Sequence, residues 1–289
     1  MIQFTGATII DTSFVSNGTK IDLLNNLGTA LDNAGWATIS GAGTSDWIRE
    51  TAVTPQGYKF RMEGQDLGGA TVSAKFTLRT DTLANTVSMY VLPTNSALYR
   101  IWANKYQFFL FKSGTTGGNR DFLCATVPWM PDFVAEVGSP PWAAWMHGSG
   151  GSDTDNTSTF TNELRASLRS GILTKCAFIW NNILFGSATN TAGLVGIIME
   201  TVNPPSPTAV DDQWEDGTWL LKEPIICKPQ GVSTSGQLTR LGQFWDSVVL
   251  AKPLDSEVKR TFAGHTWRNI THQYTGSAGQ RGSLLLKVP

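Results

Sequence analysis

The chain has 289 residues, with 22 Lys and Arg against 23 Asp and Glu, and a formal net charge of −1. This balance argues against nucleic acid as a partner, because phosphate-binding surfaces concentrate Lys and Arg. No apolar run reaches the roughly 18–20 residues that span a bilayer, so we expect no membrane insertion, and the first residues lack the pattern of a secretory signal.

The low charge content indicates a surface made for contact with other proteins. Charged residues are only 16% of the chain, below the roughly 25% typical of soluble domains. Neutral polar side chains lose less solvation on assembly than charged ones. We therefore expect protein partners and a homo-oligomer, while a monomeric Gly- and Thr-rich β protein stays open as the alternative.

An amphipathic helix is predicted from Lys20 to Trp36. Apolar residues recur there at steps of three and four, namely Ile21, Leu24, Leu27, Leu31 and Ala34. Asn17 or Thr19 can cap the start of this helix, and Gly35 can end it.

Beyond the helix the apolar period is that of β-strands. Residues 36–40 and 46–50 predict a hairpin around the turn 41–45. Further strands are expected near 58–63, 71–79, 86–92, 99–103, 106–112, 122–127, 173–180, 182–186, 195–201, 218–222, 224–227, 241–251, 259–263, 266–270 and 283–288. The fold class is therefore mainly β (α+β), with antiparallel sandwich-like sheets and one N-terminal amphipathic helix.

The segment 98–111 is strongly aromatic and carries no catalytic group. Rings such as Trp102 and Phe109 dominate the energetics of cores and of interfaces. Trp102 and Phe109 are accordingly candidates for contact with another subunit.

The middle of the chain, 137–161, is rich in Pro, Gly, Ser and Asp and predicts a long exposed loop. Trp142 and Trp145 make it a candidate contact arm. It divides the chain into an N-terminal helix plus β half, 1–136, and a C-terminal β half, 162–289, although one interleaved domain remains an alternative.

The residues that could carry catalysis form no recognised set. His147, His265 and His272 lack metal-ligand spacing, and Ser149 lacks the frame of a nucleophile elbow. The cysteines Cys124, Cys176 and Cys227 predict reduced core thiols. We expect no enzyme activity, no cofactor, no metal and no catalytic residue.

One acidic cluster is the exception. Asp211, Asp212, Glu215 and Asp216 surround Trp214, with Trp219 close behind. Carboxylates beside stacking rings suit glycan binding or hydrolysis. Trp214, Trp219, Asp212 and Glu215 are therefore glycan-contact candidates, and a charged turn is the other interpretation.

Several segments resemble virion structural proteins of tailed bacteriophages. They are 31–36, Asp46-Trp47, 52–59, 103–111, 242–249, 264–270 and 282–286. The resemblance implies a non-enzymatic particle component in the tail tip, baseplate or fibre-attachment region. It implies partnership with other phage particle proteins and a location in the virion, assembled in the host cytoplasm. The alternative is a host-surface glycan-binding or carbohydrate-active tail module.

Overall fold

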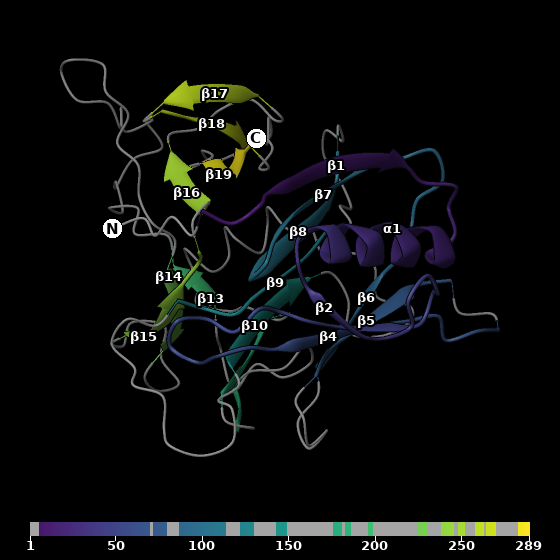
Figure 1. Ribbon diagram of the computed structural model, residues 1–289, viewed down its shortest axis with the longest axis horizontal. Coiled ribbons are helices and arrows are strands. Elements are labelled where there is room, and N and C mark those ends of the chain that lie inside the picture. Colours follow the sequence, from purple (N-terminus) through teal and green to yellow (C-terminus); the bar gives the residue numbers. More distant parts are fainter. Residues whose placement is uncertain are drawn as a thin grey trace.

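The computed structural model describes residues 6–69, 72–79, 87–113, 122–129, 143–148, 176–180, 183–185, 196–198, 225–229, 238–245, 248–251, 258–262, 264–269 and 283–289. These residues form one helix and four antiparallel sheets (Figure 1). The predicted fold class, mainly β with antiparallel sandwich-like sheets and one N-terminal helix, is confirmed.

The largest sheet has seven strands in the order β1-β7-β8-β9-β10-β11-β12. Its strands are β1 (Ile10–Val15), β7 (Leu98–Asn104), β8 (Gln107–Lys112), β9 (Phe122–Thr126), β10 (Ala143–Gly148), β11 (Cys176–Trp180) and β12 (Ile183–Phe185). It thus unites strands from both predicted halves of the chain.

A five-stranded sheet has the order β2-β3-β4-β5-β6. Its strands are β2 (Ala37–Ser40), β3 (Trp47–Glu50), β4 (Arg61–Gln65), β5 (Ala74–Arg79) and β6 (Val87–Val91). The helix α1 (Lys20–Asn33) contacts β1 and β7 of the seven-stranded sheet and β3, β4 and β5 of this one. One core therefore lies between the helix and both sheets, where Trp36 meets Phe60 and Phe108 edge-on at 5.2 and 5.9 Å between ring centroids.

The remaining strands form two smaller sheets. A three-stranded sheet contains β13 (Gly196–Ile198), β14 (Ile225–Pro229) and β15 (Leu238–Gln243). A four-stranded sheet has the order β16-β19-β18-β17 and contains β16 (Val248–Ala251), β17 (Lys259–Phe262), β18 (His265–Asn269) and β19 (Ser283–Val288).

The helix follows the predicted pattern with one exception. The hydroxyl of Thr19 caps its start by accepting from the Asp22 N–H at 3.2 Å. After the helix ends, Gly35 adopts φ +88°, a conformation that favours glycine. Leu24, Leu27, Leu31 and Ala34 are buried as expected. Ile21, however, is 46% exposed, so it does not belong to the packed face.

Several strands differ from the prediction. β1 was not expected at all, and the predicted strand 241–251 is interrupted at Phe244 and Trp245, which are both buried. The predicted hairpin is present as β2 and β3, with a register shift between Thr38 and Ser40. The predicted strand 218–222 lies outside the described residues.

Buried hydrogen bonds join segments that are far apart in sequence. Gln107 holds Trp245 at two points: its Nε2 donates to the Trp245 carbonyl at 2.5 Å, and its Oε1 accepts from the Trp245 N–H at 3.1 Å. The indole N–H of Trp102 donates to the Lys287 carbonyl at 2.5 Å. Arg268 pairs with Asp11 at 2.7 Å. The four-stranded sheet is therefore tied to β1, the edge strand of the seven-stranded sheet, and to its neighbour β7.

Candidate functional site

Two of the predicted interface residues lie in the core of their own chain. Trp102 is 1% exposed and Phe109 is 0% exposed. Their rings pack edge-on at 5.8 Å, and Phe109 also meets Phe244 at 5.7 Å. The prediction that Trp102 and Phe109 contact another subunit is therefore wrong, because interior strands of the sheet bury both rings.

The predicted exposed loop 137–161 is wrong over Ala143–Gly148. These residues form β10, which pairs with β9 and β11, and Ala144 and Met146 are buried. The backbone of Trp145 therefore lies inside a sheet, opposite Thr126 and Phe178. Trp142 and the rest of the segment lie outside the described residues, as does the side chain of Trp145.

The other predicted residues are tested only in part. The glycan-contact candidates Trp214, Trp219, Asp212 and Glu215 all lie outside the described residues. Cys124 is buried and forms no disulfide with a described residue, as predicted for a core thiol. No cluster of His, Cys, Asp or Glu side chains suited to a metal ion occurs within the described ranges. Within those same ranges, no helix is long and apolar enough to cross a membrane.

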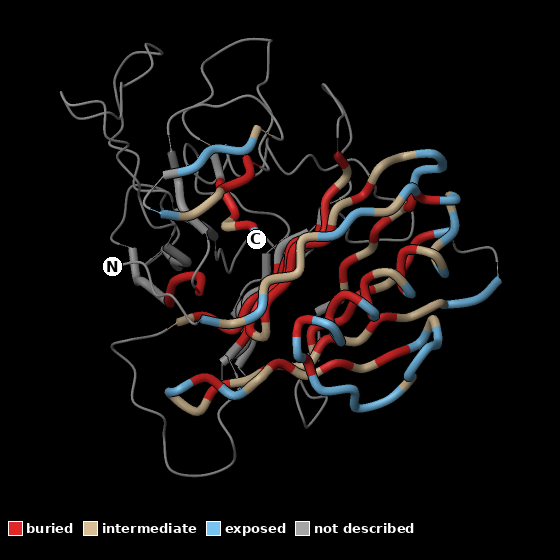
Figure 2. Tube along the Cα trace, turned by 45° about the horizontal axis from the view of Figure 1, so that its top comes forward, coloured by how far each residue is buried: buried red, intermediate tan, exposed pale blue. Residues whose placement is uncertain are grey.

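A group of loops at one end of the molecule was not singled out by the sequence. We call it the loop end and define it as residues 16–21, 41–46, 66–69, 72 and 92–97. These residues begin α1 and connect β2 to β3, β4 to β5 and β6 to β7. They lie together at the right of Figure 1, and Figure 2 shows several exposed stretches there.

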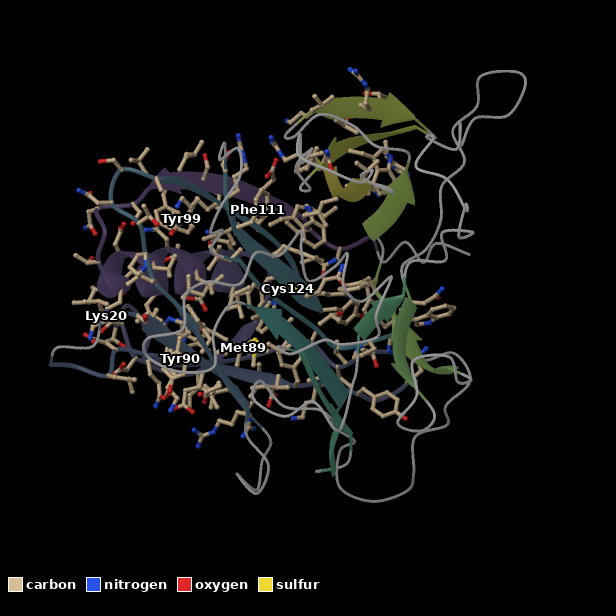
Figure 3. The ribbon with its side chains drawn as sticks, turned by 180° about the vertical axis from the view of Figure 1, so that it is seen from behind. Lys20, Met89, Tyr90, Tyr99, Phe111 and Cys124 are labelled. Carbon is tan, nitrogen blue, oxygen red and sulfur yellow. The ribbon has the colours of Figure 1, made fainter. Side chains whose placement is uncertain are left out.

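Polar contacts fix these loops to one another. The Lys20 ammonium lies 2.6 Å from an Asp66 carboxylate oxygen and donates to the Gly68 carbonyl at 3.2 Å. The Asp66 N–H in turn donates to the Asp46 carboxylate at 2.6 Å. Figure 3 labels Lys20 at this end of the molecule. Three loops are therefore linked through Lys20, Asp66 and Asp46.

The fourth loop is held by the chain that leads from β1 into α1. Ser16 donates its N–H to the Ala97 carbonyl and accepts from the Ser96 N–H, both at 2.8 Å. Ser96 has φ +58° and is the one non-glycine with positive φ in the described part of the chain. Gly18 has φ +81°, and a Cβ there would lie 2.9 Å from Cβ of Asn95. Glycine at position 18 thus permits both the turn and the close approach.

The electrostatics of the loop end centre on Asp66. Its hydrogen bond with Lys20, supported by the backbone N–H of Gly68, lowers the pKa of this carboxyl below the ordinary value of 3.8. Asp66 therefore stays ionised at pH values where an ordinary aspartate begins to take up a proton. The contact with Lys20 persists over the same range.

Apolar side chains are exposed beside these fixed polar contacts. Ile21 is 46%, Leu67 is 42% and Val72 is 59% exposed. The loop end thus combines a constrained backbone with apolar groups that face water. This combination suits contact with another macromolecule. The loops are already ordered, so they lose little conformational entropy on binding, and the exposed apolar side chains provide area that binding can bury.

The sequence signals at this end were those of ordinary turns. Asn17-Gly18 and Gly68-Gly69 mark chain reversals. No local pattern indicates that four loops meet, since the meeting depends on how the strands pair.

No protein-family model matches the chain, and no curated protein matches it. The described residues form a mainly β protein in which several loops meet at one end.

Proposed function

We propose that this chain is a non-enzymatic structural component of a tailed-phage particle, in the tail tip, baseplate or fibre-attachment region. We further propose that the loop end is the surface by which it joins a neighbouring particle protein. The phage assignment depends on the resemblance of its sequence segments. The assembly role depends on one observation, the exposed apolar side chains on loops that are held by hydrogen bonds.

Rigid loops favour tight assembly. A loop that is already fixed loses little conformational entropy when a partner binds. Lys20, Asp46 and Asp66 supply this rigidity while their charges are largely satisfied within the chain. Binding then removes Ile21, Leu67 and Val72 from water without separating an ion pair.

The carboxylates of this end support binding rather than catalysis. Asp66 accepts from Lys20 and from the Gly68 N–H, and Asp46 accepts from the Asp66 N–H. Asp22, which follows the loop end in the first turn of α1, accepts from the Asn17 N–H at 3.1 Å and from Asn26 at 3.0 Å. A general base needs access to a substrate proton, whereas these groups have structural partners.

The location of the chain is tested in purified particles. Mass spectrometry of the particles, together with antibody labelling in electron micrographs, is expected to place the chain in the tail tip, baseplate or fibre attachment. Absence of the chain from particles, or release of sugar from host glycans by the purified protein, would contradict the proposal.

The role of the loop end is tested by Val72→Asn, with Val53→Asn as its matched control. Val53 is 56% exposed, close to the 59% of Val72, but it lies at the opposite end, where Ala52 bonds to Lys105. We expect Val72→Asn to reduce incorporation into particles several-fold and Val53→Asn to leave it unchanged. Both variants should keep the wild-type melting temperature. Equal incorporation of the two variants would exclude the loop end as the contact surface.

A further inference from the structure

β1 is an edge strand whose outer backbone groups face away from its sheet. Ser16 donates to the Ala97 carbonyl in continuation of the β1–β7 register. In an antiparallel pair alternate residues bond the same neighbour, so Ile10, Thr12 and Phe14 bond to β7. Asp11, Ser13 and Val15 therefore direct their N–H and C=O groups outward. No described residue hydrogen-bonds to those backbone groups.

Two other edges of these sheets carry features that discourage pairing, and β1 has neither of those features. β2 is interrupted by the register shift between Thr38 and Ser40, and β17 exposes Lys259 and Arg260. Bulges and exposed lysines are the usual protection of an edge. β1 runs through Ile10–Val15 with a continuous register, and it contains neither proline nor lysine.

We propose that β1 pairs antiparallel with β1 of a second copy of this chain, so that two seven-stranded sheets become one. The outward residues are spaced evenly about Ser13. A two-fold axis perpendicular to the sheet then sets Ser13 opposite Ser13 of the second copy and Asp11 opposite Val15. Each such pair exchanges two N–H···O bonds.

The charges and side chains of β1 fit a second copy. The one charged side chain of the strand, Asp11, is neutralised within its own chain by Arg268 at 2.7 Å. In the symmetric register Asp11 lies opposite an apolar Val15, so no like charges meet. Val15, which is 67% exposed, gains a neighbour across the interface. Thr12 lies opposite Phe14 on the other face of the sheet.

Substitution at Ser13 separates backbone pairing from side-chain effects. Ser13→Pro removes the outward N–H but no bond to β7, and proline is tolerated at an edge strand. Ser13→Ala keeps the N–H and removes the same hydroxyl, so it is the matched control. In sedimentation velocity over a range of concentrations, wild type and Ser13→Ala are expected to dimerise. Ser13→Pro is expected to weaken association at least about tenfold, because each copy loses a hydrogen bond.

Cross-linking tests the register even if Ser13→Pro fails to fold. In the proposed dimer the two Ser13→Cys thiols lie on directly opposed residues, about 5.5 Å apart at Cα, within the reach of a disulfide. In the same dimer the Val15→Cys residues of the two copies are offset by four residues along the strands, which is about 14 Å. This distance is too long for a disulfide. Mild oxidation should therefore link Ser13→Cys and spare Val15→Cys, with the linkage mapped by mass spectrometry.

Three results would overturn the proposal. They are a wild-type chain that stays monomeric at every concentration, equal dimerisation of Ser13→Pro and wild type, and equal cross-linking at positions 13 and 15. Binding of an extended strand from another protein by a monomeric wild-type chain would assign β1 to that partner instead.

Discussion

Replacing Gly64 by alanine is expected to destabilise the fold mainly through the ring of Trp47. This ring is 1% exposed and lies between α1 and β4, and its indole N–H donates to the Leu24 carbonyl at 2.9 Å. A Cβ at Gly64 would lie 2.5 Å from Trp47 Cε2 and 2.6 Å from Cζ2, and 2.9 Å from Leu24 Cδ2, the end of a flexible side chain. The ring cannot retreat without losing its hydrogen bond to the helix. We expect Gly64→Ala to cost about 1–3 kcal/mol, the usual range for an overfilled core.

Gly28→Ala provides a matched comparison against the same ring. A Cβ there would lie 3.1 Å from Trp47 Nε1 and 3.3 Å from Cδ1, a much milder contact. Gly28 is inside α1, where alanine is favoured over glycine by about 1 kcal/mol. The two effects oppose each other, so Gly28→Ala should change the free energy of unfolding by less than Gly64→Ala does.

The assay is urea unfolding followed by circular dichroism, with Trp47→Phe as the third variant. Phenylalanine is smaller than the indole and makes room for the new methyl group. Gly64→Ala combined with Trp47→Phe should therefore be more stable than the sum of the single losses implies, by about 0.5–2 kcal/mol. Additive losses, or a Gly64→Ala protein within about 0.5 kcal/mol of wild type, would refute the clash with Trp47.

Two further predictions concern charged pairs. The Asp66 carboxyl should titrate below 3.8 when its carbon shift is followed by NMR, and Lys20→Met should raise the midpoint toward that value. The pKa of Asp66 is lower in the folded than in the unfolded chain, so the ionised carboxylate stabilises the fold above about pH 4. This contribution is lost as the pH falls through the folded pKa. A wild-type midpoint at or above 3.8 would contradict the assignment. Arg268→Met should cost about 3 kcal/mol in urea unfolding, because it leaves Asp11 largely buried without its cation. Adding Asp11→Asn should restore part of that loss, and strict additivity would show that the pair does not interact.

The helix and most strands follow from local patterns in the sequence. Leu24, Leu27 and Leu31 repeat at helical spacing, and Thr19 is a good cap, so α1 is specified by nearby residues. β1 has no such signal. Its Asp11 looks unsuited to a packed strand until Arg268, 257 positions later, neutralises it.

The aromatic segment shows a different limit of sequence reasoning. A run that includes Trp102 and Phe109 requires burial, but a core and an interface satisfy that requirement equally well. Both β7 and β8 pair with a strand on each side, so they lie inside the sheet and their rings belong to the core. The strand at Ala143–Gly148 was missed for a related reason, because its Pro- and Gly-rich surroundings suggest a loop while its pairing partners lie elsewhere in the chain.

The loop end could be predicted only as separate turns. Lys20 and Asp66 are far apart in sequence, and neither has a local feature that identifies the other as its partner. Their contact exists because α1 begins, and β4 ends, at the same edge of the core.

The bonds between early and late segments have a consequence for biosynthesis. Asp11 and Arg268 are separated by 257 residues, and Trp102 and Lys287 by 185. At about 5–20 residues per second, a ribosome takes about 13–50 s to pass from the first member of the Asp11–Arg268 pair to the second. During that interval the emerging chain holds an Asp11 carboxylate and a Trp102 indole whose final partners have not been made. A chaperone that binds nascent chains would bind this one during that interval. A premature stop before β18 would leave both groups without their native partners.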